Sequence, residues 1–303
     1  MPDKMDYMGP LKNILLATDG SKHSEGAIKE AIYLAKSCVA KLSVIYVLEI
    51  NPELETEGQK LVEKMENEAR EHIDEIRKRA ARENVECEVI ARRTDQPFKA
   101  IVEEAEKRNI DVIVMGRRGR TGLKKALMGS VTAKVIGYAP CKVLIVPVDA
   151  RIDCKNIMLA TDGSKYSEAA AAEAISIAKR CGSNLMVVSV VSLEAKQHYE
   201  TGFLTSRLKK ALDEIRWKDS PEAAERNISA VMEMAKNEGV NAEGLALIGR
   251  HYEAIVDAAR EHNTDIIVLG AHGKTGIERL LMGSVTERVI ALSPCTVLVV
   301  KIR

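Results

Sequence analysis

The sequence predicts two tandem α/β domains, residues 1–150 and 151–303, each built on a five-stranded parallel sheet flanked by helices. Three observations predict this fold class. The length of 303 residues fits about two domains of roughly 150 residues each. The chain repeats long blocks of its own sequence. Within each copy, short apolar runs alternate with amphipathic helical patterns, as expected where strands and helices alternate along the chain.

The internal repeat is carried by two blocks that recur in the same order. Residues 12–36 and 155–179 are identical at 18 of 25 positions, and residues 116–141 and 270–295 are identical at 14 of 26. The copies of the first block lie 143 residues apart and those of the second 154 residues apart, so the second copy has gained 11 residues between the blocks. A period near 150 residues is far longer than a solenoid repeat, which indicates duplicated domains that meet around residues 148–154.

The expected strands of the first copy are apolar runs at 13–17, 41–48, 85–91, 111–115 and 142–148. Helical patterns lie between them, with Ser21 or Ser24 as the expected cap of the first helix and Pro140 after the last. The second copy repeats the plan at 156–160, 184–191, 245–248, 265–269 and 296–301. Its least regular stretch, 192–227, contains Trp217 and Pro221 and predicts a loose helical excursion, with a lid as the alternative. Strands that are apolar on both faces predict a parallel sheet covered on both sides.

Composition argues against several classes of protein. The net charge is +1 and only 3% of residues are aromatic, so nothing favours general nucleic-acid binding or a polybasic membrane patch. No apolar run reaches the roughly 18–20 residues of a membrane span, and the N-terminus lacks the apolar stretch of a signal peptide, so we expect a cytoplasmic protein. The six cysteines have no CxxC or metal-ligand spacing, which favours reduced, buried thiols over a redox or zinc role.

The candidate site lies where two loops follow strands of the predicted sheet. Ligands of open parallel sheets bind beyond the carboxyl ends of the strands, where the strand order reverses. The loop after the first strand contains Thr18-Asp19-Gly20-Ser21, repeated as Thr161-Asp162-Gly163-Ser164. The loop after the fourth strand has the spacing G-x2-G-x9-G-S in both copies. We therefore expect the two loops of each copy to meet at one edge of its sheet.

The glycine spacing indicates a backbone cradle for an anion. Gly116 and Gly119 let the chain turn tightly and bring its amides close to a ligand. Gly129 and Ser130 then open a helix whose free amides suit phosphate, and the Ser130 hydroxyl is expected to cap this helix or to donate to phosphate. Asp19 would repel phosphate, so ribose hydroxyls or the adenine edge suit it better. The alternatives are a tight structural turn for the glycines and helix capping for the aspartate.

Other nucleotide-binding motifs are absent from the sequence. The P-loop pattern GxxxxGK[ST] fails because Val268 stands where its first glycine would be, five residues before Gly273. No GxGxxG follows the first strand, and no SGGxDS-type pyrophosphate loop occurs. These absences argue against a dinucleotide-binding domain and against an adenylating enzyme.

Three motifs occur in register in both copies: ATDGS after the first strand, the glycine-spaced loop with LMGSVT, and a last strand that follows Pro-Cys. Together they make each copy resemble the universal stress protein family over nearly its whole length. The resemblance implies a flavodoxin-like, Rossmann-like sheet of order 3-2-1-4-5 and pairing of two domains through their fifth strands, here within one chain, with a homodimer expected in addition. It also implies binding of ATP or AMP, with Mg²⁺ or Mn²⁺ held through the phosphates.

The resemblance assigns nucleotide-binding residues copy by copy. Strand ends and aspartates are expected at the adenosine, and the glycines, the serine and the valine after it at the ribose and phosphates. In the first copy these residues are Ala17, Asp19, Val47, Gly116, Gly119, Gly129, Ser130 and Val131. In the second copy they are Ala160, Asp162, Val190, Gly270, Gly273, Gly283, Ser284 and Val285.

The two glycine-spaced loops differ in charge. The first copy carries Arg117, Arg118 and Arg120 where the second carries Ala271, His272 and Lys274. The arginines are expected either to tighten the binding of a triphosphate or simply to lie exposed. His272 is the one histidine in these loops, and the others, His72 among them, are expected on the surface or in packing.

The predicted function is nucleotide binding in a regulatory or stress-response role. No nucleophile and base recur in both copies, so we expect at most slow ATP hydrolysis. A true ATP hydrolase or nucleotidyl-transferring enzyme is one alternative. An interaction scaffold with vestigial pockets is the other.

Overall fold

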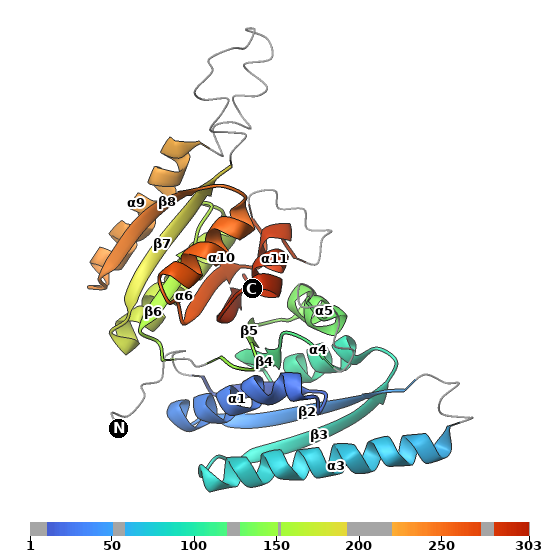
Figure 1. Ribbon diagram of the computed structural model, residues 1–303. Helices are drawn as coiled ribbons and strands as arrows, with labels where there is room; N and C mark the ends of the chain where they lie inside the picture. Colours follow the sequence, from blue (N-terminus) through green and yellow to red (C-terminus); the bar gives the residue numbers. More distant parts are fainter. Residues whose placement is uncertain are drawn as a thin grey trace, which may run out of the picture.

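A computed structural model describes residues 11–50, 58–119, 128–150, 153–192, 220–273 and 282–302. Within these ranges the strands form one ten-stranded sheet with helices on both of its faces (Figure 1). Most of the irregular stretch of the second copy, with Trp217, lies outside the described residues, as do Arg120 and Lys274. No helix among the described residues has the length and apolar character needed to cross a membrane.

Strands and helices alternate in each copy, as predicted. The first copy contains β1 (Asn13–Thr18), the 3₁₀ turn η1 (Lys22–Ser24), α1 (Glu25–Cys38), β2 (Lys41–Glu49), α3 (Gln59–Arg82), β3 (Cys87–Thr94), α4 (Pro97–Lys107), β4 (Val112–Gly116), α5 (Ser130–Tyr138) and β5 (Lys142–Val146). The second copy contains β6 (Asn156–Ala160), α6 (Lys165–Cys181), β7 (Asn184–Val191), α9 (Pro221–Asn237), β8 (Ala242–Ile248), α10 (His251–Glu261), β9 (Ile266–Gly270), α11 (Ser284–Leu292) and β10 (Thr296–Val300).

The sheet has the order β3-β2-β1-β4-β5-β10-β9-β6-β7-β8. Each half therefore has the order 3-2-1-4-5, and every pair within a half is parallel. The strand order reverses between β1 and β4 in the first copy and between β6 and β9 in the second. The carboxyl ends of these central strands are where ligands of such sheets bind.

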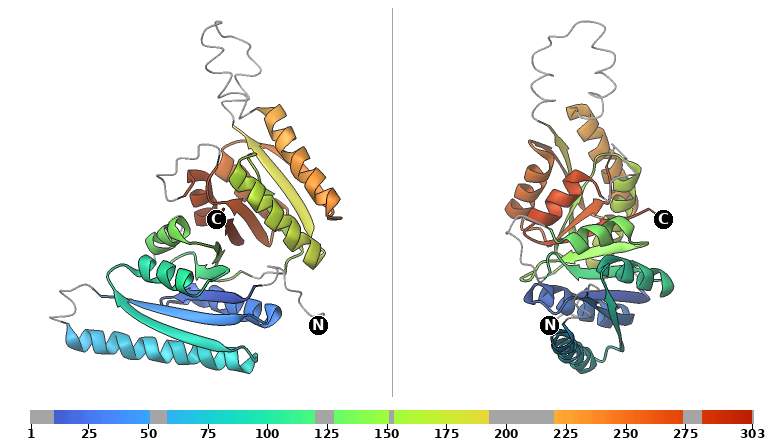
Figure 2. Two further views of the ribbon diagram at one scale, coloured as in Figure 1. Left: turned by 180° about the vertical axis from the view of Figure 1, so that it is seen from behind. Right: turned by 90° about the vertical axis from the view of Figure 1, so that its right-hand side faces the viewer.

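The two halves join through their fifth strands, as the family resemblance implied. β5 and β10 pair antiparallel, with Val143 opposite Val299 and Leu144 opposite Leu298. An ion pair between Lys142 and Glu173 of α6, 2.8 Å long, also crosses between the copies. The edge strands β3 and β8, with α3 and α9 packed on them, lie at opposite ends of the molecule (Figure 2).

The core explains why the strands are apolar on both faces. Leu16, Val114 and Leu144 pack under α1 and α3 on one face, whereas Leu15 and Ile113 pack under α4 and α5 on the other. All of these side chains are fully buried, so consecutive residues of one strand serve both layers. The second copy is layered in the same way, with α6 and α9 on one face and α10 and α11 on the other.

The predicted serine cap of the first helix is wrong. α1 begins after Ser24, but neither the Ser21 nor the Ser24 side chain accepts a hydrogen bond from the helix amides. The Ser24 hydroxyl instead donates to the Ser21 carbonyl at 2.8 Å, because η1 occupies the position of the first turn. In the second copy Ser164 does cap α6, accepting from the Ser167 amide.

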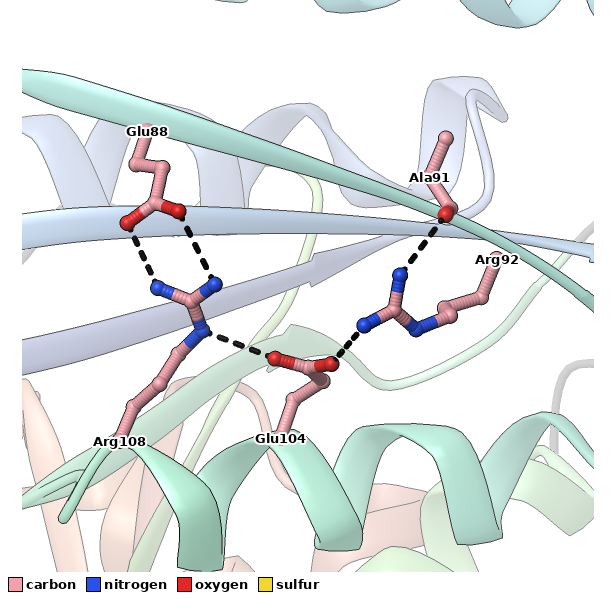
Figure 3. Close-up of polar contacts among 5 residues, drawn as sticks. All are labelled: Glu88, Ala91, Arg92, Glu104 and Arg108. Carbon is pink, nitrogen blue, oxygen red and sulfur yellow. Dashed lines mark hydrogen bonds and ion pairs between the residues drawn. The ribbon is translucent and has the colours of Figure 1, made fainter.

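An ion-pair network fastens α4 to the edge strand β3 (Figure 3). Glu104 of α4 is buried and accepts hydrogen bonds from Arg108 Nε at 2.8 Å and from Arg92. Arg108 also donates to both oxygens of Glu88, at 2.6 and 3.0 Å. Burial alone would raise the pKa of Glu104, but the hydrogen bonds from the two arginines outweigh burial and lower the pKa. At the corresponding positions of Arg92, Glu104 and Arg108, the second copy has Leu247, Ala258 and His262.

Candidate functional site

The two predicted loops of each copy meet at the carboxyl edge of the sheet. β1 and β4 are hydrogen-bonded neighbours with Ala17 opposite Met115, so the loops that follow them leave the sheet side by side. A Cβ atom added to Gly119 would lie 2.7 Å from Asp19 Oδ2. The same contact recurs in the second copy, where a Cβ on Gly273 would lie 2.8 Å from Asp162 Oδ2.

We call these two arrangements the first and second cradles. The first cradle comprises residues 116–119, Gly129 and Ser130, with Asp19 beside them. The second comprises residues 270–273, Gly283 and Ser284, with Asp162 beside them. Residues 120–127 of the first loop and 274–281 of the second lie outside the described residues.

Two of the three glycines in each cradle are needed for packing within the protein. A Cβ on Gly116 would lie 2.7 Å from the His23 carbonyl oxygen, and one on Gly270 would lie 2.8 Å from that of Tyr166. Added Cβ atoms on Gly119 and Gly273 would instead displace an aspartate carboxylate, which is the end of a side chain and not backbone. The structural interpretation of these glycines therefore has direct support, whether or not a ligand approaches them.

The third glycine of each cradle has no such internal reason. Gly129 has φ −64° and ψ 141°, a conformation that any residue can adopt. Its added Cβ would lie 3.4 Å from Thr132 Oγ1, and one on Gly283 would lie 3.5 Å from His272 Cα, which are ordinary contact distances. Among the described residues, nothing lies close enough to these added Cβ atoms to require a glycine at either position.

The uncapped helices α5 and α11 begin at these two glycines. Gly129 and Gly283 are the N-cap residues, and neither helix has a side-chain cap among the described residues. The predicted capping role of Ser130 is wrong, because Ser130 is the first helical residue and does not occupy the cap position. Its side chain is exposed, as is that of Ser284. The first amides of an uncapped helix are unsatisfied donors at the positive end of its dipole, where anions bind.

Each cradle is closed by hydrogen bonds between its two ends. The Gly129 amide donates to the Arg117 carbonyl at 3.1 Å, and the Gly283 amide donates to that of Ala271 at 2.9 Å. The buried Thr132 hydroxyl donates to the Gly116 carbonyl at 3.3 Å, and Thr286 does the same to Gly270 at 3.0 Å. The sequence interpretation missed these threonines, although their recurrence in the GSVT segment of both copies is a signal that points to them.

The aspartates stabilise the loops that carry them. Asp19 Oδ1 accepts from the Ser21 amide at 3.0 Å, and Asp162 Oδ1 accepts from the Ser164 amide at 3.0 Å. These contacts form local turns. The N-cap residues of η1 and α6 are Ser21 and Ser164, so the helix-capping alternative for the aspartates is wrong. The buried Ser21 hydroxyl has no hydrogen-bond partner among the described residues.

The apolar residues assigned to the sites lie at strand ends or in the first turns of α5 and α11. All of them belong to, or pack against, one apolar cluster on the α4 and α10 face of the sheet. They are Ala17, Val47 and Val131 in the first copy and Ala160, Val190 and Val285 in the second. All except Ala17 are only partly buried, so part of their surface stays accessible.

One position on α3 and α9 also contacts the loop that carries the aspartate, and the sequence interpretation missed it. His72 of α3 lies with Nε2 3.1 Å from Thr18 Oγ1, one residue before Asp19. Asn227 occupies the corresponding position on α9 and lies against Gly163. Because the two copies carry different residue types there, no repeated motif marks the position.

Arg117 serves neither of the predicted roles. It is half-buried, and its Nη1 donates to the carbonyls of Ser293 at 2.7 Å and Ile290 at 3.4 Å in the second copy. Burial lowers the pKa of the guanidinium, and the nearby charge of Arg118 adds to this effect. The His272 ring packs against that of Tyr166, with 5.1 Å between the ring centroids.

No metal site of protein side chains accompanies the cradles. Over the described ranges, no group of three or more histidine, cysteine, aspartate or glutamate residues could hold a metal ion. Two surface hollows of about 760 and 230 Å³ lie at the amino ends of β6–β8, at the opposite edge of the sheet from the cradles.

Comparison with known proteins matches the two copies separately. The model of the universal stress protein family matches residues 10–147 and again residues 154–301. The chain belongs to the universal stress protein family. The boundary proposed between residues 150 and 151 falls between the two matched segments.

Individual relatives cover either one copy or both. A universal stress protein of Methanocaldococcus jannaschii is 39% identical over 139 residues, which is 45% of this chain and 81% of that protein. The crystal structure of a universal stress protein from Archaeoglobus fulgidus matches with a TM-score of 0.72 and 24% identity, covering 95% of this chain and 96% of that one. At this identity the match shows a shared fold. A universal stress protein crystallised in complex with cAMP is 26% identical over 48% of this chain and 96% of that one, with a TM-score of 0.37.

Proposed function

We propose that this universal stress protein binds an adenine nucleotide, ATP or AMP, in each of its two cradles and acts as a regulatory protein. The observation that carries the proposal is a glycine, Gly129 or Gly283, at each of two uncapped helix starts. Among the described residues, neither backbone conformation nor close packing requires a glycine at these two positions, and close approach of a ligand would explain it. An uncapped helix start selects an anion as that ligand.

The other cradle residues suit the rest of a nucleotide. The partly buried valines, Val47 and Val131 in the first copy, offer an apolar wall to the adenine ring. The aspartates, placed where the two loops touch, would accept hydrogen bonds from ribose hydroxyls. A Mg²⁺ or Mn²⁺ ion would be held through the phosphates, because the only acidic group assigned to each cradle is its aspartate.

A regulatory role with at most slow hydrolysis fits the side chains better than dedicated catalysis. The described part of each cradle offers a serine hydroxyl that is exposed and carries no hydrogen bond to a base. A homodimer of the whole chain and a cytoplasmic location belong to the same proposal. Steady-state turnover with Mg²⁺ at about 1 s⁻¹ or faster would favour the hydrolase alternative instead.

The direct test identifies and counts the ligand. The purified protein is denatured, and the released nucleotide is identified by mass spectrometry. Calorimetric titration of the emptied protein with ATP and with AMP should then give two sites per chain, and Gly129→Val or Gly283→Val should each remove one. Saturating nucleotide should raise Tm, since at 100 times Kd a ligand stabilises the native state by about 2.7 kcal/mol. Absence of both binding and a Tm shift would favour the scaffold alternative.

A further inference from the structure

The end of each cradle helix that points away from its cradle is held by a cation from the other copy. α11 starts at the second cradle, and its last carbonyls accept from Arg117 of the first copy, with Nη1 2.7 Å from Ser293 O. α5 starts at the first cradle, and its last carbonyls accept from Lys301 of the second copy, with Nζ 2.7 Å from Gly137 O and 3.0 Å from Ile136 O. Both helices lie at the junction of the two halves (Figure 1).

These contacts are specific interactions at a helix terminus. The last carbonyls of a helix lack partners and carry partial negative charge, so a cation placed there is favourable. Both side chains are half-buried, and burial lowers the pKa of Lys301 as it does that of Arg117. A desolvated cation needs strong partners, and for both residues the described hydrogen-bond acceptors are helix carbonyls.

The two cations do not come from corresponding positions. Ala271 stands in the second copy where the first has Arg117, and Pro147 stands in the first where the second has Lys301. The same task at the two ends of the junction is therefore carried out by unrelated residues from different loops. Because these two residues are not copies of each other, duplication of the domain does not explain why both helix ends contact a cation. The recurrence therefore points to the contact itself as the feature that matters.

Each cation is also joined to the cradle of its own copy. The Arg117 carbonyl accepts the Gly129 amide at 3.1 Å, which is the bond that closes the first cradle. Lys301 follows Val300, whose carbonyl accepts the amide of Ala271 in the second cradle at 3.0 Å. A nine-residue helix is about 13 Å long and rigid, so the position of its far end sets the position of its first amides.

We propose that Arg117 and Lys301 are positioning residues that couple the two cradles, with Arg117 setting the affinity of the second cradle and Lys301 that of the first. The inference rests on the proposed function, since it concerns how the same two sites communicate. A ligand in one cradle holds the residues that carry the cation of that copy, and thereby holds the far end of the helix of the other cradle. The coupling is positive, and linkage requires it to be reciprocal.

The test measures each cradle alone. In Gly283→Val protein only the first cradle is open, and adding Lys301→Met should weaken its affinity for ATP by about fivefold or more, the lower end of typical coupling. In Gly129→Val protein only the second cradle is open, and Arg117→Met should weaken it similarly. Methionine keeps the apolar stem and removes the charge. Lys301→Arg and Arg117→Lys should restore most of the affinity.

Lys142→Met is the matched control. It removes a cation that also crosses between the copies, in the ion pair with Glu173, but no described contact joins it to the end of a cradle helix. This variant should leave both affinities within about twofold of the parent, whereas general loosening of the junction would lower them as much as Lys301→Met does. Circular dichroism and Tm verify folding of every variant.

The outcomes separate the two proposals. If the unaltered chain binds neither ATP nor AMP, the proposed function fails and the coupling fails with it. If the unaltered chain binds at both cradles but Lys301→Met and Arg117→Met leave the remote affinities unchanged, the proposed function survives and the coupling alone is wrong. A loss at the remote cradle that the control Lys142→Met reproduces would also overturn it.

Discussion

Gly129→Ser should stabilise the protein and weaken nucleotide binding at the first cradle, two effects of opposite sign. Gly129 is the N-cap residue of α5, with φ −64° and ψ 141°. Ser164 occupies the N-cap of α6 in the same extended region, and its hydroxyl accepts from the Ser167 amide at 3.3 Å. A serine at position 129 would accept from the Thr132 amide in the same manner, and its Cβ fits at ordinary contact distance.

The gain in stability has two parts. Replacing a glycine in a conformation that other residues adopt without strain stabilises by about 0.4–1 kcal/mol through the unfolded chain. A serine cap adds about a few tenths of a kcal/mol over glycine. The sum of about 0.5–1.3 kcal/mol corresponds to a rise in Tm of roughly 1–2 °C for a protein of this size.

The loss in binding should exceed the gain in stability. The new hydroxyl takes a helix amide that would otherwise donate to phosphate, and the new side chain hinders close approach of the ligand. One hydrogen bond to a charged group contributes about 1.5–3 kcal/mol, so the affinity for ATP should fall roughly 10- to 100-fold.

Two measurements on the same sample decide the matter. Tm is recorded without nucleotide, and the affinity of the first cradle is titrated by calorimetry in the Gly283→Val background. Gly283→Ser is the matched variant. It should also raise Tm, but it should weaken binding only at the second cradle. Wild-type affinity at the first cradle of Gly129→Ser, together with a raised Tm, would refute the reasoning. The serine would then cap α5 without weakening nucleotide binding, so the first amides of α5 would not be donors to the phosphate.

Three further predictions concern packing, acidity and thiol reactivity. Gly119→Ala places a Cβ 2.7 Å from Asp19 Oδ2, so we expect a loss of about 1–3 kcal/mol by denaturant unfolding and weaker binding at the first cradle; unchanged values would contradict the close approach. Glu104→Gln should lower the free energy of unfolding by about 1–3 kcal/mol at pH 7. Because the folded pKa of Glu104 is lowered from 4.5, the difference between variant and parent should shrink as pH falls below about 4.5. A difference that does not change with pH would exclude the ion pairs as its cause. Burial raises the pKa of Cys295 to about 11. At pH 8 its alkylation by iodoacetamide should be roughly 200-fold slower than that of an exposed thiol and should rise up to pH 11, and fast labelling at pH 8 of folded protein would contradict its burial.

The fold could be predicted from the sequence because both faces of each strand are buried. Leu15 and Leu16 are adjacent and point to opposite layers, yet both are fully buried, so the strand appears in the sequence as a continuous apolar run. The repeat then located the corresponding strands of the second copy. β8 is an instructive exception, since it begins at Ala242, three residues before the predicted start, because Gly244 interrupts the apolar run and the edge strand is largely exposed.

The cradles could be predicted only in part, because motif spacing reports backbone requirements and not contacts between distant side chains. The glycines and aspartates recur in both copies and do lie together at the strand ends. Arg117 looked like a cation for phosphate, and only the antiparallel pairing of β5 with β10 brings it within 2.7 Å of Ser293 O. His72 and Asn227 occupy corresponding positions but are different residue types, so a comparison of the two copies could not identify this position as part of the site.

Fusion of the two copies in one chain removes a constraint that a symmetric dimer would obey. In a twofold dimer the same residue must serve both ends of the interface, so a cation that holds one helix end appears at the other end as well. Here Arg117 serves one end and Lys301 the other, and the unused positions hold Ala271 and Pro147. Once the junction no longer needs to be self-complementary, the two cradles can differ in sequence. The first turn of α11 carries Glu287, an acidic residue at the anion-binding end of the helix. The corresponding residue of α5 is Ala133. The second cradle should therefore be the weaker one for phosphate, and positive coupling through Arg117 would let the first cradle control when the second fills.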